Sequence, residues 1–190
     1  MKKELFRNGS VVVIDEMQFW RVTGLPEDAE QAAVFMREHL TVGEYKEVQF
    51  SSDALAVACK EVLDDIVTVR TSCRIYTLDT ARFSPEYHLA EAYTLECEEC
   101  RAAVMRDVST VSDCRWDGAG ELFVYTAPAY REMRLGTVAC KVAVARMLEQ
   151  GLSPFATVRR HQYPAAALAA RIGFVLDREE PVWGLRKEAE

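Results

Sequence analysis

The 190-residue sequence lacks a long hydrophobic run, a low-complexity tract and an excess of basic residues. No apolar stretch reaches the roughly 18 residues that a membrane helix needs. No long apolar segment follows Lys2 and Lys3, so the sequence shows no secretory signal peptide and we expect a cytoplasmic protein. Because 23 Lys and Arg stand against 30 Asp and Glu, the chain does not have the basic character of a general nucleic-acid binder. We therefore expect neither nucleic acid nor a membrane as its partner.

The sequence also lacks a second cysteine pair that could complete a zinc site. Cys97 and Cys100 form a lone CxxC, whereas a structural zinc ion needs four ligands and the nearest other cysteines, Cys73 and Cys114, stand singly. Without a secretion signal, the six cysteines are expected to be free thiols in a reducing compartment. We expect no metal, and we keep a zinc-stabilised interaction module around Cys97 and Cys100 as an alternative.

What the sequence does have is enough apolar material for one sizeable core. Hydrophobic residues make up 49% of it, and a chain of this length buries roughly 70% of the surface that its unfolded form exposes. We therefore expect a single domain over residues 1–190. The charge is unevenly divided, since residues 1–120 hold 13 Lys and Arg against 22 Asp and Glu, whereas residues 121–190 hold 10 against 8. The second part leaves room for a local anion site.

Hydrophobic periodicity and turn residues predict the elements of the first 120 residues. Residues 88–95 fit either a strand or a helix. The other expected elements are a hairpin or a broken first strand over 11–22, helices over 26–40 and 51–66, and strands over 67–78, 102–105 and 108–114.

The remaining residues predict alternating strands and helices, which is typical of an α/β or α+β fold. Glycines at 151 and 173 mark helix ends. The expected elements are a strand over 121–126, a polar loop over 129–134, a helix over 135–148, a strand over 155–158, a helix over 163–171, and two closing strands over 174–176 and 182–185.

The loop that precedes the helix at Leu135 has the chemistry of an anion site. The first amides of a helix have no intrahelical partner and carry a partial positive charge, which suits a phosphate. Arg131 and Arg134 lie in this loop, and Gly136 would let a ligand approach the backbone closely. The alternative is an ordinary strand-to-helix connection with solvated arginines.

Two segments resemble the signatures of the GNAT N-acyltransferase superfamily. Residues 124–136 (VYTAPAYREMRLG) are similar to motif A, in which a strand leads into the loop Arg/Gln-x-x-Gly-x-Gly/Ala. Residues 162–174 (QYPAAALAARIGF) are similar to the later helix of that family, which ends in Leu-Gly-Phe. Ser153-Pro154-Phe155 resembles the start of the strand that splays from the motif A strand. The resemblance covers about residues 100–185.

The resemblance implies a mixed, mostly antiparallel central sheet flanked by helices and splayed between the strands at 121–126 and 155–158. It implies an acyl-coenzyme A-binding core over 96–190, with residues 1–95 as a strand–helix–helix start. The loop would hold the pyrophosphate of acetyl-coenzyme A. The implied binding residues are Val124, Tyr125, Thr126, Arg131, Glu132, Met133, Arg134, Leu135, Gly136, Thr137 and Gln162.

The chain departs from the family pattern at three of its positions. Arg134 stands where motif A has its first glycine, so either the backbone there has a negative φ or the cradle is looser, with the arginine itself reaching a phosphate. Gln162 replaces an asparagine. Ala169 replaces a tyrosine that serves many members as the acid. These departures motivate the alternative of a catalytically degenerate acyl-coenzyme A-binding regulator or scaffold.

The resemblance implies direct transfer of an acetyl or other acyl group from coenzyme A to a primary amine in a ternary complex. Glu121 is the candidate base, and its alternative is an exposed, silent glutamate at a strand edge. The backbone N–H of Val124 or Tyr125 would stabilise the oxyanion if the strand splays at a bulge. Tyr163 is a weak candidate acid, although we expect Tyr163, like Tyr130, to be a packing residue.

The acceptor is expected to be a small-molecule or peptide amine. The acidic first part of the chain favours a cationic acceptor. A homodimer remains open. Cys140 falls inside the motif A helix and is expected to lie in the core rather than to act as a nucleophile.

Overall fold

The computed structural model describes residues 3–16 and 19–188, and the chain divides into two compact units. Unit 1 comprises residues 1–73 and 179–190, and unit 2 comprises residues 74–178. Two long strands, β5 (Val67–Leu78) and β11 (Phe174–Arg186), contribute residues to both units. These boundaries differ from the division at residue 95 expected from the sequence, and a single domain over 1–190 stays a prediction.

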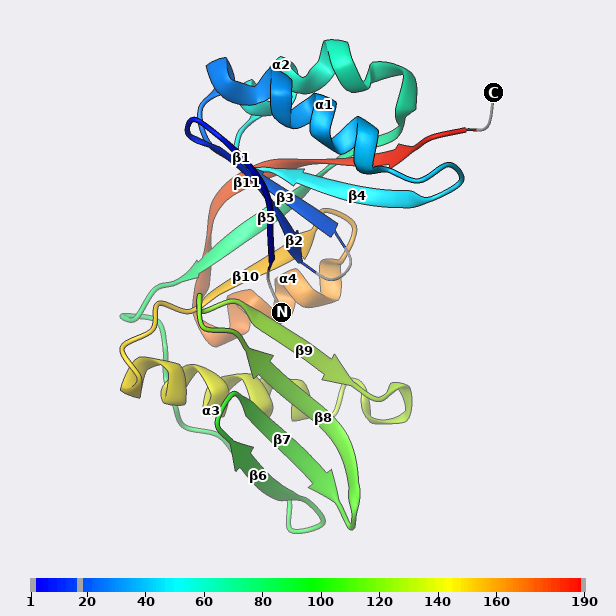
Figure 1. Ribbon diagram of the computed structural model, residues 1–190. Coiled ribbons are helices and arrows are strands. Elements are labelled where there is room, and N and C mark those ends of the chain that lie inside the picture. Colours follow the sequence, from blue (N-terminus) through cyan, green and yellow to red (C-terminus); the bar gives the residue numbers. More distant parts are fainter. Residues whose placement is uncertain (1–2, 17–18, 189–190) are drawn as a thin grey trace. The chain divides into compact units, whose positions relative to one another are not determined.

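Unit 1 consists of a sheet and two helices that pack side by side (Figure 1). The β1–β2, β2–β3 and β4–β11 pairs are antiparallel, whereas β3 and β4 run parallel. Its further elements are β1 (Lys3–Asn8), β2 (Val11–Glu16), β3 (Phe19–Thr23), the 3-10 turn η1 (Pro26–Asp28), α1 (Ala29–His39), β4 (Tyr45–Phe50), α2 (Asp53–Leu63) and the 3-10 turn η2 (Asp64–Ile66).

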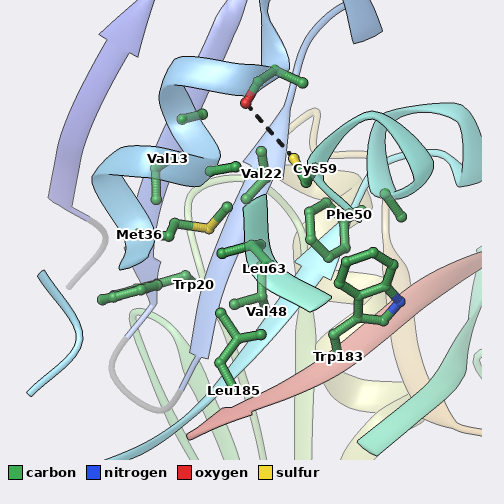
Figure 2. Close-up of a cluster of buried hydrophobic side chains, with 14 of the residues drawn as sticks. Val13, Trp20, Val22, Met36, Val48, Phe50, Cys59, Leu63, Trp183 and Leu185 are labelled. Atoms are coloured by element: carbon green, nitrogen blue, oxygen red, sulfur yellow. Dashed lines mark hydrogen bonds between the residues drawn. The ribbon is translucent and has the colours of Figure 1, made fainter. Parts of the chain in front are cut away.

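The core of unit 1 is made by large side chains of the sheet that meet both helices. Figure 2 shows Met36 of α1 and Leu63 of α2 among them, both fully buried. Phe50 and Trp183 pack edge to face with ring centroids 4.9 Å apart. The Cys59 thiol donates to the Ala29 carbonyl at 3.8 Å, and burial raises the pKa of Cys59 to about 12. This thiol is therefore a protonated core group.

Unit 2 is built on an antiparallel four-stranded sheet in the order β6-β7-β8-β9. Helix α3 packs on one face of this sheet, against β7 and β8 (Figure 1). Its elements are β6 (Thr94–Glu98), β7 (Arg101–Arg106), β8 (Ser109–Trp116), β9 (Leu122–Thr126), the 3-10 turn η3 (Pro128–Tyr130), α3 (Leu135–Glu149), β10 (Phe155–Arg159) and α4 (Tyr163–Ile172).

The remaining strands follow the order β1-β2-β3-β4-β11-β5-β10. The expected mixed α/β fold with mostly antiparallel pairing is thus confirmed, and β9 is the edge strand of its sheet. Among the residues described, no helix is both long and apolar enough to cross a membrane.

Three sequence predictions need correction. The segment 88–95 is irregular up to the start of β6, not a helix or a long strand. The two closing strands are one continuous strand, β11, which runs through Pro181; this residue lacks a backbone donor, and the pairing with β4 begins directly after it, at Val182. Strands β1 and β4 were not predicted, since their sequences KELFRN and YKEVQF mix charged and apolar residues. The described part of the hairpin at 11–22 is confirmed.

Candidate functional site

Strands β9 and β10 meet at one end and then belong to different sheets. Glu121 and Phe155 form an isolated parallel bridge, and the Phe155 N–H donates to the Gly120 carbonyl at 2.9 Å. Beyond this bridge the two strands separate: β9 pairs with β8, whereas β10 is the neighbour of β5 in the other sheet. The splay predicted between 121–126 and 155–158 is therefore present, and both strands lie within unit 2.

The register of β9 determines which of its amides face the splay. The Ala127 N–H donates to the Val111 carbonyl at 2.9 Å, and Tyr125 lies opposite Asp113 in a continuous register. Because hydrogen-bonded and non-bonded pairs alternate in an antiparallel ladder, the Tyr125 N–H faces β8 whereas the Val124 N–H faces the free edge. Of the two oxyanion donors predicted, only Val124 has the required direction, and no bulge is needed.

The loop between β9 and α3 has two non-glycine residues in the left-handed region. Glu132 has φ 64° and Arg134 has φ 61°. Of the two alternatives for Arg134, a negative φ is wrong, since this residue has a left-handed backbone conformation. Met133 lies between these two left-handed residues. When left-handed and right-handed residues alternate in this way, successive backbone N–H groups point toward the same side and form a concavity that binds anions.

Helix α3 starts directly after this loop and leaves amides without an intrahelical acceptor. The N–H groups of Thr137 and Val138 donate to the Arg134 carbonyl at 3.0 and 3.2 Å. The Leu135 and Gly136 amides precede these bonds and have no acceptor within the helix. They are thus oriented to bind an anion at the helix N-terminus.

Gly136 is required for packing between the helix and the strand. A Cβ at this position would lie 3.0 Å from Thr126 Oγ1, with Ser112 Oγ and Leu168 Cδ2 at 3.8 Å. Ser112 Oγ donates to the Tyr125 carbonyl at 3.0 Å and lies 2.8 Å from Thr126 Oγ1. A side chain at position 136 would therefore point into the protein interior. We predicted that glycine stands here to let a ligand approach the backbone, but the contacts show that it leaves room for Thr126 and its neighbours.

Arginines from two elements surround the loop. Arg131 Nε lies 3.4 Å from the Thr126 carbonyl oxygen, which is consistent with that carbonyl facing the free edge of β9. Arg171, in the last turn of α4, donates to Thr137 Oγ1 at 3.5 Å. Arg134 is exposed at the N-cap of α3. Sequence reasoning missed Arg171, because only the packing of α4 against α3 brings it to this helix N-terminus.

Glu121, the candidate base, is buried rather than exposed. Only 3% of its surface is accessible, and its backbone exchanges hydrogen bonds with the Asp117 turn, where the Asp117 Oδ1 accepts from the Glu121 N–H at 2.9 Å. Because side chains alternate along a strand, Glu121 shares a face with Phe123 and Tyr125. The exposure assumed in the alternative is therefore wrong, and the role of Glu121 as the base stays a prediction.

The remaining predicted residues lie at the start of α4 and in η3. Tyr163 is 72% exposed in the first turn of α4, so the expected packing role is wrong for this tyrosine. Gln162 Oε1 accepts from the Arg159 N–H at 3.4 Å and belongs to the turn between β10 and α4. Tyr130 packs edge to face against Tyr93 at 6.5 Å, as expected of a packing residue.

The cysteines of unit 2 divide into buried and exposed pairs. Cys140 is 3% exposed and Cys114 fully buried, and the hydrogen bond that the Cys114 thiol donates to Cys140, together with burial, raises the pKa of Cys114. The position of Cys140 in the core is confirmed. Cys97 and Cys100 are exposed free thiols. Over residues 3–16 and 19–188, no group of three or more His, Cys, Asp or Glu side chains could hold a metal ion.

The fold and this site define a protein with a splayed sheet and a helix-capped anion loop. A family model described as the acetyltransferase (GNAT) family matches residues 79–174, just over half of the chain. The chain therefore belongs to the GNAT family, and the matched range contains the splay, the loop and α4. A search of curated proteins found no significant match.

Solved structures support the same fold over nearly the whole chain. A GCN5-related N-acetyltransferase-like protein from Streptococcus suis is 17% identical, with TM-score 0.66 over 94% of this chain and 85% of that one. A putative GNAT acetyltransferase from Novosphingobium aromaticivorans is 13% identical, with TM-score 0.65 over 96% and 91%. A GCN5-related N-acetyltransferase from Kribbella flavida is 14% identical, with TM-score 0.65 over 97% and 89%. These likenesses show the fold.

Proposed function

We propose that the protein is an N-acyltransferase that moves an acetyl or other acyl group from acyl-coenzyme A to a primary amine. The observation that carries this proposal is the loop between β9 and α3. Glu132 and Arg134 hold positive φ angles there, next to the free edge of a strand that splays from β10. The loop suits a pyrophosphate, and the free strand edge suits an extended amide chain such as pantetheine.

The donor would be bound by backbone groups and arginines of unit 2. The Leu135 and Gly136 amides, with Arg131 and Arg171, offer hydrogen bonds and positive charge to the pyrophosphate. The Val124 N–H, on the free edge of β9, would donate to the thioester oxygen. A donor of this kind stabilises the negative charge that develops on that oxygen during attack.

The reaction would be a direct attack of the amine on the thioester carbonyl. A primary amine with a pKa near 10.4 is mostly protonated at pH 7, so a base must remove a proton before or during attack. Glu121 would accept that proton, directly or through one water molecule. The C–N bond forms, the C–S bond breaks and the thiolate leaves. Because a thiol has a pKa near 8.5, an acid such as Tyr163 helps but is not essential.

A binding protein without turnover is the second candidate. Ala169 is 6% exposed and has no hydroxyl at the position where many family members carry the acid. Tyr163 is in the exposed first turn of α4. A protein with an intact loop but no acid could bind acyl-coenzyme A as a regulator or scaffold.

Calorimetry with acetyl-coenzyme A, combined with free-thiol release across a panel of amines, tests both candidates. We expect binding and amine-dependent release in the wild type. The double variant Arg131→Gln, Arg171→Gln should weaken binding about tenfold or more, whereas Arg82→Gln, an exposed arginine paired with Asp79, should not. Binding without release would favour the regulator. The absence of binding would contradict both.

A further inference from the structure

A groove of about 470 Å³ lies on the face of the unit 2 sheet that α3 does not cover. It is lined by Arg101, Thr110, Asp113, Arg115, Phe123, Val124 and Tyr125. The alternate residues of β7 and β8, such as Ala102 and Cys114, pack in the core cluster beneath α3. The groove therefore lies on the opposite face, and it includes β9, the strand whose free edge would hold the thioester.

Asp113 organises two arginines at the floor of this groove. It is 4% exposed, and its Oδ2 accepts from Arg101 Nε at 3.1 Å and from Arg115 Nε at 2.9 Å. Arg101 has further acceptors, since its Nη1 donates to Glu98 at 3.1 Å and its Nη2 to Thr110 at 2.9 Å. Asp113 thus fixes both guanidinium groups, and each of the three nitrogens of Arg101 already donates to an acceptor within unit 2.

Arg115 differs from Arg101 because its two terminal nitrogens have no acceptor within the described part of the chain. Its side chain is 64% exposed, and only its Nε is engaged, by Asp113. A guanidinium held through Nε presents Nη1 and Nη2 as a fork, which matches the two oxygens of a carboxylate. The groove therefore has one oriented, unsatisfied anion-binding group.

Two aromatic side chains stand beside this fork. Phe123 lies opposite Arg115 and Tyr125 opposite Asp113 in the ladder, with 49% and 55% of their surfaces exposed. Large apolar side chains on the same face of an edge strand offer a platform for an apolar or planar ligand. The Val124 N–H lies between them in the chain, so the platform adjoins the proposed reacting centre.

We propose that this groove binds the acceptor, and that the acceptor is an amine with a carboxylate and an apolar or aromatic body. Arg115 binds the carboxylate, and Phe123 and Tyr125 contact the body. The assignment of this ligand as the acceptor rests on the proposed acyl transfer. It replaces the cationic acceptor expected from charge, because the acidic excess lies in unit 1, with 10 Lys and Arg against 17 Asp and Glu, whereas unit 2 has 13 of each.

The first test measures ligand binding without requiring turnover. N-acetylphenylalanine and its carboxamide, which lacks the negative charge, are titrated against the full chain by ligand-observed NMR. We expect the acid to bind at least about tenfold more tightly, Arg115→Gln to remove that preference, and Arg115→Lys to restore part of it. Arg82→Gln, a change at an exposed arginine of unit 2, should leave it intact. Equal binding of the two ligands, or an unaffected Arg115→Gln variant, would overturn the proposal.

The second test separates failure of the groove from failure of the proposed function. Thiol release from acetyl-coenzyme A is compared for phenylalanine and for phenethylamine, which lacks the carboxylate. We expect kcat/KM to favour phenylalanine about tenfold, mainly through KM, and Arg115→Gln to remove the difference. Faster or equal turnover of phenethylamine would overturn the groove assignment while acyl transfer stands. Acid-selective binding without thiol release from any amine would overturn acyl transfer and support the groove as a carboxylate site.

Discussion

The two units of the chain differ in charge and in where non-glycine residues adopt positive φ angles. Unit 1 carries the whole formal charge of −7, with 10 Lys and Arg against 17 Asp and Glu, whereas unit 2 has 13 of each. Within the described residues, all three non-glycine residues with positive φ (Asp107, Glu132 and Arg134) belong to unit 2. Backbone strain of this kind concentrates at functional sites. Net charge is thus a poor guide to where the chemistry lies in this protein.

The two units also differ in the surroundings of their buried glutamates. In unit 1, Glu180 is 2% exposed and accepts from Gln49 Nε2 at 2.7 Å, a contact between two strands inside a sheet. In unit 2, Glu121 is equally buried but lies where β9 and β10 separate. A buried carboxylate beside a splay can meet a substrate, whereas one between paired strands is a structural group.

The largest effect that we expect separates these two buried glutamates. Glu121→Gln should lower kcat about 100-fold, because a general base contributes at least that much, and should leave the affinity for acetyl-coenzyme A unchanged. Glu180→Gln is the matched change in unit 1 and should leave kcat within about twofold. Steady-state thiol release and calorimetry measure both. If the two variants lose activity equally, Glu121 is not the base and the difference between the units disappears.

Elements with a local signature could be predicted from the sequence. The strand expected over 67–78 is β5 (Val67–Leu78), because Val, Ile, Thr and Tyr dominate it. The helix expected over 135–148 is α3 (Leu135–Glu149), because its apolar residues keep helical spacing. Strand β4 (Tyr45–Phe50) has no such signature, and its partners β3 and β11 lie far away in the sequence.

The candidate site likewise contains parts that a local sequence pattern predicts and parts that it does not. The motif A loop, including Arg131, could be predicted from consecutive residues. The contact of Arg171 with Thr137 spans 34 positions, and the Asp113 cluster joins Arg101 to Arg115 across two strands. No local pattern encodes such contacts, since they arise from tertiary packing. The positive φ at Arg134 was also beyond sequence reasoning, because arginine adopts it rarely.

A smaller effect is expected from adding one methyl group at the helix start. In Gly136→Ala the Cβ would lie 3.0 Å from Thr126 Oγ1, so the Thr126 side chain or the first turn of α3 must move by a few tenths of an ångström. We expect about 1 kcal/mol less stability and acetyl-coenzyme A binding that is roughly fivefold weaker, because the Gly136 amide moves. Gly118→Ala is the control, since nothing lies within 4 Å of its Cβ. Urea unfolding and calorimetry test this, and equal results for the two variants would contradict the packing role of Gly136.

Relief of backbone strain at Arg134 should have a still smaller effect. A left-handed conformation costs a non-glycine residue about 1 kcal/mol, and the greater freedom of glycine in the unfolded chain offsets part of the gain. We expect Arg134→Gly to raise stability by about 0.5 kcal/mol and to weaken acetyl-coenzyme A binding severalfold, because a cation leaves the loop. Asp107→Gly, at φ 54° in the β7–β8 turn, should change stability without changing binding. Unchanged binding in Arg134→Gly would show that the Arg134 side chain contributes nothing to the anion site.

The smallest effect concerns unit 1 and its dependence on pH. Asp28 Oδ2 accepts from the Ser10 N–H and the Ser10 hydroxyl, both at 2.8 Å. Both hydrogen bonds lower the pKa of Asp28 below its ordinary value, and the bond from the Ser10 backbone has the larger effect. A lowered pKa stabilises the folded chain above the unfolded-state pKa, near 3.9, and this contribution is lost as pH falls through the folded-state pKa. Asp28→Asn should therefore lower the Tm slightly at pH 7 and progressively less toward pH 3, with acetyl-coenzyme A affinity unchanged at pH 7.

A Tm difference that stays constant with pH would show that Asp28 acts through its shape, and a change in affinity would show that unit 1 contributes to the site.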